Sequence, residues 1–135
     1  MTELLNCELK KLYNWFLIYK LTINLEKTVY MVFRFHNLHI DTSSLNITIN
    51  NNKIKEVKNT KFLGVIIDEQ LNWKDNINTI ACKISKAIGV LNRLKSFLPL
   101  RILVNLYNTM ILPHLSYCII VWGKCAKYLL NRIYY

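Results

Sequence analysis

Residues 61–94, KFLGVIIDEQLNWKDNINTIACKISKAIGVLNRL, contain the change of pattern that decides the fold. Up to Asp68 the stretch is mostly apolar, which predicts a buried strand with one glycine, Gly64, where another backbone or a ligand comes close. After Trp73 the apolar residues recur every three or four positions and most lysines lie off that stripe, which predicts a long basic helix. The change from strand to helix therefore falls between residues 72 and 73.

Upstream of this stretch the sequence predicts one helix and several short strands. Apolar residues with helical spacing predict an amphipathic helix over residues 2–20. The β-branched and aromatic run over residues 28–35 predicts a strand. The alternation over residues 45–49 predicts another strand, which returns over residues 53–57 as an antiparallel hairpin because the asparagines at 50–52 tolerate positive φ.

Downstream, prolines divide a helical region. Pro99 predicts the start of a second helix, and Pro113 ends or kinks it before a third apolar stretch over residues 115–122. The sequence therefore predicts an α+β fold. Residues 1–72 form a mixed region of one helix, short antiparallel strands and a hairpin, and residues 73–135 form an all-helical bundle.

Composition limits the partner class and the compartment. The chain has 135 residues, of which 53% are hydrophobic, and its 18 Lys and Arg against 8 Asp and Glu give a formal net charge of +10. Such an excess attracts polyanions, so nucleic acid is the leading partner class, although AT-rich coding also raises the lysine content. We expect no membrane partner and no small-molecule ligand. The most apolar stretch, residues 110–122, is broken by Pro113 and too short to cross a bilayer.

The cysteines and histidines do not form a metal-binding pattern. The four cysteines are scattered without a C-x-x-C pair, so we expect no metal site and free thiols in a reducing compartment. An intracellular, soluble protein is expected, since the first residues are not those of a signal peptide. No catalytic role is assigned to the histidines, which are His36, His39 and His114.

Three blocks of residues match, in order, the pattern of one protein family. They are residues 15–33, WFLIYKLTINLEKTVYMVF; residues 62–73, FLGVIIDEQLNW; and residues 111–123, ILPHLSYCIIVWG. Together they resemble the last part of the palm and the thumb of the reverse transcriptases of non-LTR (LINE, jockey-like) retrotransposons. Tyr19 and Asn76 stand where the family usually has Asn and His. The resemblance covers nearly the whole chain.

The resemblance implies an RNA-directed DNA polymerase, a nucleotidyltransferase that uses two Mg²⁺ ions held by clustered carboxylates. The sequence contains no Asp-Asp hairpin of the family's kind, and Asp68-Glu69 is expected to be a solvated strand end because neighbouring strand residues point to opposite faces. We therefore expect no cofactor in this chain, Mg²⁺ being a cofactor of the full-length family enzyme. In isolation the chain should be inactive, and the polymerase portion that it lacks is a further partner implied by the resemblance.

The resemblance also marks residues that would act on nucleic acid. Lys27 matches a family lysine whose position resembles the one from which polymerases protonate the pyrophosphate leaving group. In this chain the role of general acid would be a relic. Phe62-Leu63-Gly64 matches the hairpin that grips the primer terminus, where a glycine lets the sugar-phosphate backbone approach. The first thumb-like helix would contact duplex phosphates through Lys83, Lys86, Arg93 and Lys95. Each of these residues also has a purely structural interpretation. Lys27 would be a surface lysine in a turn, Phe62-Leu63-Gly64 would belong to an ordinary core strand, and the four basic residues would be solvated charges on a helix.

Two classes of function are left open by the sequence. The first is a fragment of a reverse transcriptase that retains binding to RNA or to RNA–DNA duplex. The second is a small basic protein that binds nucleic acid without catalysing a reaction. A peripheral membrane protein built on the basic helix over residues 73–97 is a weaker third, because the apolar stripe of that helix lacks bulky aromatic anchors.

Overall fold

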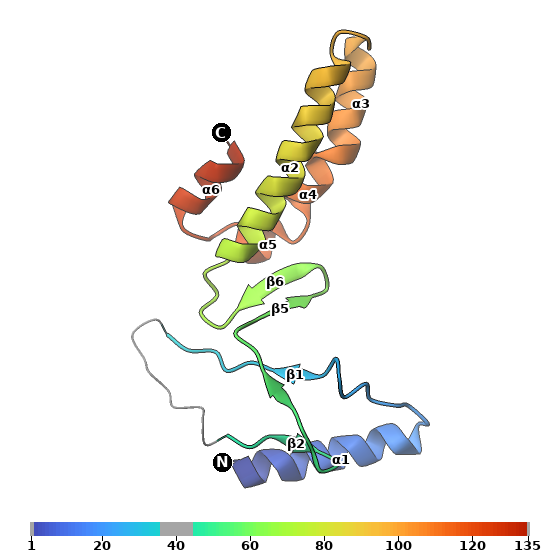
Figure 1. Cartoon of the computed structure of the whole chain (residues 1–135), viewed down its shortest axis with the longest axis vertical. Coiled ribbons are helices and arrows are strands. Elements are labelled where there is room, and N and C mark those ends of the chain that lie inside the picture. Colours follow the sequence, from blue (N-terminus) through green and yellow to red (C-terminus); the bar gives the residue numbers. More distant parts are fainter. Residues whose placement is uncertain (1, 36–44, 135) are drawn as a thin grey trace. The chain divides into compact units, whose positions relative to one another are not determined.

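The computed structural model describes residues 2–35 and 45–134, so His36 and His39 lie outside the described residues (Figure 1). The chain forms two compact units, Met1–Asn59 and Thr60–Tyr135. Among the described residues, one helix and then a series of short strands come first, and helices alone follow in the C-terminal part. The α+β class predicted from the sequence is therefore confirmed.

The first unit begins with the predicted amphipathic helix, α1 (Thr2–Ile18). The helix ends just before Lys20, whose φ of 56° turns the chain away from the helical path. Asn6 links α1 to the strands, because its amide Nδ2 donates to the carbonyl of Asn46 (3.0 Å) and its Oδ1 accepts from the N–H of Thr48 (3.1 Å). One polar side chain thus satisfies two backbone groups of the neighbouring segment.

Short strands complete the first unit. The predicted antiparallel hairpin is present as β2 (Thr48–Ile49) and β3 (Asn52–Lys53), with positive φ at the two asparagines between them. However, β1 (Val29–Tyr30) pairs with β4 (Lys55–Glu56) in parallel, so the expectation of purely antiparallel pairing is wrong. The long connection between β1 and β4 permits this parallel arrangement. The strand expected over residues 28–35 has only two paired residues.

The core of the first unit is small and comes from one face of its strands. Ile47 and Ile49 are buried, as the alternation over residues 45–49 predicts, and together with buried Ile54 they pack against Leu9 and Tyr13 of α1. These few side chains fix the register of the short strands.

The second unit begins with a β-hairpin of β5 (Asn59–Phe62), whose first residue is the last of the first unit, and β6 (Val65–Asp68). The single buried strand expected over residues 61–68 is therefore wrong, since the chain folds back at Leu63 and Gly64. Their φ values of 46° and 87° are the two positive angles that a two-residue type I′ turn requires. The apolar pattern misled because Phe62 and Leu63 are 61% and 75% exposed.

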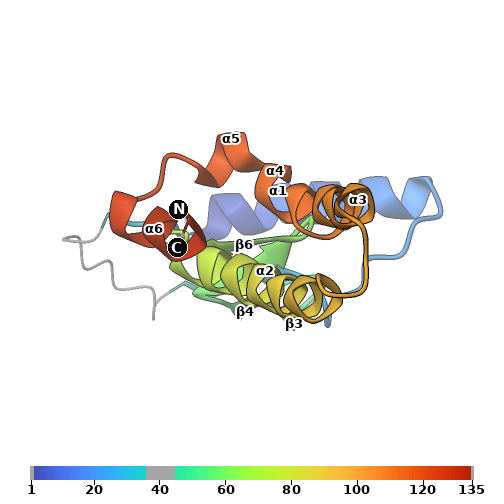
Figure 2. The same cartoon turned by 90° about the horizontal axis from the view of Figure 1, so that it is seen from above.

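Helices form the rest of the second unit. The predicted basic helix is α2 (Lys74–Leu94), and α3 (Leu100–Met110) lies beside it in both views (Figures 1 and 2). Two short helices follow, α4 (Leu112–Ser116) and α5 (Ile119–Trp122). Pro113 lies in the first turn of α4. The last helix, α6 (Lys127–Tyr134), was not expected from the sequence.

Two buried clusters hold these helices together. The first contains Ile77 of α2, Trp122 of α5 and Leu129 of α6, and the second contains residues from α2 and from the α3–α4 junction: Ile84, Ala87 and Ile111. Each cluster packs against α2, so this helix is the axis of the unit. Within the described residues, no helix combines the length and the apolar character needed to cross a membrane.

Candidate nucleic-acid interface

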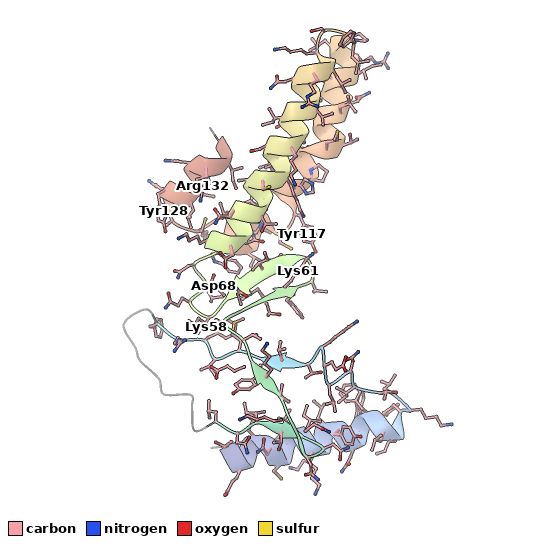
Figure 3. The ribbon with its side chains drawn as sticks, in the orientation of Figure 1. Lys58, Lys61, Asp68, Tyr117, Tyr128 and Arg132 are labelled. Carbon is pink, nitrogen blue, oxygen red and sulfur yellow. The ribbon has the colours of Figure 1, made fainter. Side chains whose placement is uncertain are left out.

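The turn of the β5–β6 hairpin is fastened to the helices by Tyr117. Its hydroxyl donates to the carbonyl oxygen of Leu63 (2.5 Å), and a Cβ placed on Gly64 would lie 3.4 Å from Tyr117 Cε1. Buried Trp122 donates in turn from Nε1 to the carbonyl oxygen of Tyr117 (2.8 Å). Figure 3 shows Tyr117 at the turn end of the hairpin and Asp68 at the other end. The exposed turn therefore has a fixed main chain.

Asn76 fastens the second strand of the hairpin to α2. Its Oδ1 accepts the N–H of Ile66 (3.1 Å), which fixes the orientation of the amide, and the residue is only 4% exposed. Its Nδ2 has no hydrogen-bond partner among the described residues. An unsatisfied buried donor costs about 1–3 kcal/mol, so Asn76 is an unusual residue for a purely structural position.

Asp68 organises the loop that leads into α2. Its Oδ1 accepts the N–H groups of Gln70 and Asn72, both at 3.0 Å, and its Oδ2 accepts the N–H of Trp73 at 2.9 Å. The loop contains positive φ angles at Leu71 (54°) and Trp73 (63°), which these bonds hold in place. The half-buried carboxylate is thus an anchor of the loop and not the solvated strand end expected from the sequence.

The four predicted basic residues are all exposed, but they do not share one face. At about 100° per helical residue, Lys83, Lys86 and Arg93 fall within an arc of about 80° on α2. Lys95 follows the last residue of α2 and falls at least about 120° from any of them. We call Lys83, Lys86 and Arg93 the basic strip. Their role in binding stays a prediction, as does that of Lys95.

Lys27 lies in the first unit, in an exposed turn. Asn24 closes this turn, since its Oδ1 accepts the N–H of Lys27 (3.1 Å) and its carbonyl accepts the hydroxyl of Thr28 (2.7 Å). The relic general-acid role of Lys27 stays a prediction. Across residues 2–35 and 45–134, no three His, Cys, Asp or Glu side chains gather in a way that could hold a metal ion.

A cavity of about 230 Å³ lies within the second unit, behind the hairpin turn. Gly64 and Lys83, which the sequence indicated separately, both line this cavity. Asn76, His114 and Tyr117 line it as well. Sequence reasoning gave these last three residues no binding role. His114 and Tyr117 do lie in the family-like block over residues 111–123, and Asn76 is a departure from the family pattern, but only the folded chain brings them together.

Comparison with known proteins supports one relationship. No protein-family model matches the chain, and no solved structure matches it. The RNA-directed DNA polymerase from mobile element jockey of Drosophila funebris is 31% identical over 90 residues. The match covers 64% of this chain and 10% of that polymerase, so the chain spans about a tenth of the length of this relative. Over those residues the chain is similar to a segment of a mobile-element RNA-directed DNA polymerase.

Proposed function

We propose that this chain is a nucleic-acid-binding segment of a non-LTR reverse transcriptase, and that its second unit holds an RNA–DNA duplex. The observation that carries the proposal is the exposed turn whose main chain is fixed by Tyr117. Phe62 and Leu63 project from the turn into solvent, and Gly64, whose missing Cβ faces the ring of Tyr117, adopts the positive φ that the turn needs. Such a turn suits contact with a sugar-phosphate backbone and needs no base-specific groups.

The charge on α2 supports the same function. The basic strip lies on exposed positions of α2, the helix that packs against β6. The first turn of the same helix also carries one acid, Asp75. Phosphate contacts by lysine and arginine provide affinity without reading sequence. The 31% identity to the jockey polymerase makes a nucleic-acid duplex the ligand to test first.

Binding to a fluorescently labelled RNA–DNA duplex across a salt series tests this function. Replacing Lys83, Lys86 and Arg93 together by Gln should make the slope of log K against log salt less negative by about 2–3, at about 0.9 per phosphate contact. The matched control replaces three other exposed basic residues by Gln, namely Lys74, Lys124 and Lys127. It removes the same charge and should change the slope much less. Equal losses in both variants would show diffuse charge attraction and overturn the proposed interface.

The chain is further proposed to have no polymerase activity alone. Two-metal nucleotide transfer needs clustered carboxylates, and the sequence contains no Asp-Asp hairpin to supply them. A primer–template extension assay with Mg²⁺ should therefore give no incorporation above background. Incorporation that survives repurification of the chain would contradict this proposal and require a different catalytic centre.

A further inference from the structure

The connection between α2 and α3 carries an exposed aromatic side chain on a fixed main chain. Phe97 is 82% exposed, more than any other aromatic residue that the structure describes in the second unit. Its N–H donates to the carbonyl oxygen of Leu94 (2.9 Å), and half-buried Leu98 donates to the same oxygen (3.1 Å). Pro99 then caps the start of α3. We call residues 93–101 the helical tip, and its hydrogen bonds hold the main chain while Phe97 projects into solvent.

The charges of the helical tip have only a partial structural explanation. Arg93 and Lys95 stand at the C-terminal end of α2, where the helix dipole favours positive charge. Arg101 is the second residue of α3, where both the dipole and the two other cations disfavour it. Residues 76–135 contain eight Lys or Arg and no Asp or Glu, so no carboxylate in this range offsets the repulsion. Arg101 is therefore better explained by an anionic ligand than by the fold.

The exposed ring restricts which anion fits. Phe97 and Leu100, which is 76% exposed, add a flat apolar surface to the cations. A nucleotide combines both features, because its phosphate meets Lys or Arg and its base stacks on an aromatic ring. An unpaired base presents its face directly, whereas a base in a duplex must first be unstacked.

The helical tip is separate from the β5–β6 turn. Helix α2 has 21 residues, so its two ends are about 30 Å apart, and the tip lies at the end remote from β6 (Figure 1). Lys95, which does not lie on the basic strip, belongs to this second surface.

We propose that the helical tip binds an unpaired nucleotide of a nucleic-acid strand, with Phe97 stacked on the base and with Lys95 and Arg101 at its phosphates. The inference rests on the proposed function for the class of partner. It goes further, because it assigns a second surface to the single-stranded part of the ligand. Stacking does not distinguish strongly among bases, so binding should depend on the presence of a base and little on its identity.

Two forms of one labelled RNA–DNA duplex test this assignment. Both carry the same short unpaired extension, but in the second form the extension is abasic, so its phosphates remain and its bases are missing. The wild-type chain should bind the first form about tenfold more tightly than the second. Phe97→Ala should abolish this difference, and Phe97→Trp should restore it, because an indole ring also stacks. Phe97 is exposed, so both variants should fold, and thermal unfolding checks this.

Tyr128→Ala is the matched control for Phe97→Ala. Tyr128 is also an exposed aromatic residue next to a lysine, but it lies on α6 (Figure 3). This variant should keep the full difference between the two extended duplexes. Equal binding of the two forms by the wild type, or an unchanged difference in Phe97→Ala, would overturn the inference.

Arg101 separates binding from stability. Arg101→Glu places an acid in the first turn of α3, so the chain should unfold at a higher temperature. Its affinity for both extended duplexes should fall more than its affinity for a blunt duplex, because both extensions contain phosphates. Lys127→Glu makes the same charge change at the first residue of α6 and should weaken binding to blunt and extended duplexes equally. The same binding pattern in both variants would contradict a phosphate contact by Arg101.

The remaining outcomes distinguish this inference from the proposed function. Sedimentation with vesicles of phosphatidylcholine and phosphatidylserine tests the other surface that an aromatic residue and cations could meet. Sedimentation that Phe97→Ala abolishes, without a difference between the two extended duplexes, would make a membrane the partner and overturn the inference. Binding of the blunt duplex through the basic strip, without any dependence on unpaired bases, would refute the tip and leave the proposed function intact. Absence of any duplex binding at low salt would refute both.

Discussion

Leu63 adopts a conformation that leucine rarely takes. Its φ of 46° lies in the left-handed region, which costs an L-residue with a Cβ about 1–2 kcal/mol, and asparagine followed by glycine suits this type of turn better. The side chain is 75% exposed, so little burial offsets the cost. Backbone strain of this kind concentrates at functional sites, where an exposed side chain is useful for contact.

Leu63→Asn should therefore stabilise the fold and weaken binding. We expect the free energy of unfolding to rise by about 1 kcal/mol, because the strain is relieved and little apolar burial is lost. Affinity for RNA–DNA duplex should fall. Urea denaturation and duplex titration measure the two effects.

Leu71→Asn is the control for Leu63→Asn. Leu71 also has a positive φ, 54°, and is 48% exposed, but it lies in the β6–α2 loop away from the turn. It should gain comparable stability and retain affinity. Equal affinity of the Leu63 variant and the wild type would contradict a role for this side chain.

At the scale of elements, the hairpin requires its glycine and the long helix does not. Gly64 in the turn has a φ of 87°, and its missing Cβ faces the ring of Tyr117. Gly89 lies inside α2, and nothing lies within 4 Å of where its Cβ would be. The first glycine is required by the backbone, whereas the second only lowers helix propensity.

Alanine at these two positions should have opposite effects. Gly64→Ala should lower the free energy of unfolding by about 1–2 kcal/mol, because a Cβ at this φ is strained. Gly89→Ala should raise it by about 1 kcal/mol, because alanine is the better helix former and meets no neighbour. Urea denaturation of both variants, with equal m-values, checks the pair. A Gly64→Ala chain as stable as the wild type would mean that the turn can relax into another conformation.

The same elements show what the sequence could predict. Helices α1, α2 and α3 follow apolar stripes of helical period, so their residues alone indicated them. The apolar pattern alone missed the β5–β6 turn, because exposed Phe62 and Leu63 continue an apolar run, whereas the family resemblance matched Phe62-Leu63-Gly64 to a hairpin. Helix α6 was missed because buried Leu129 belongs to no long apolar stripe. The cavity could not be predicted, since it depends on α2 and α4 meeting behind the turn.

At the scale of the whole molecule, much apolar surface is left uncovered. Helix α1 contains no buried residue, and Leu4, Leu17 and Ile18 are 71%, 53% and 76% exposed. The core of its unit contains three buried isoleucines. Exposed apolar residues in such number on one helix mark interaction surfaces or aggregation sites. The net charge of +10 opposes association at low salt but is screened as salt rises.

We therefore predict that the isolated chain self-associates, and more strongly as salt is raised. Sedimentation velocity over a range of protein and salt concentrations should show a rising average mass. The double substitution of Leu4 and Ile18 by Gln should reduce this association, because it removes apolar surface while leaving the net charge unchanged. Asn14→Gln on the same helix, a polar exchange at an exposed position, should leave it as in the wild type. A monodisperse monomer with one sharp thermal transition would contradict the prediction and show that the first unit satisfies its own apolar face.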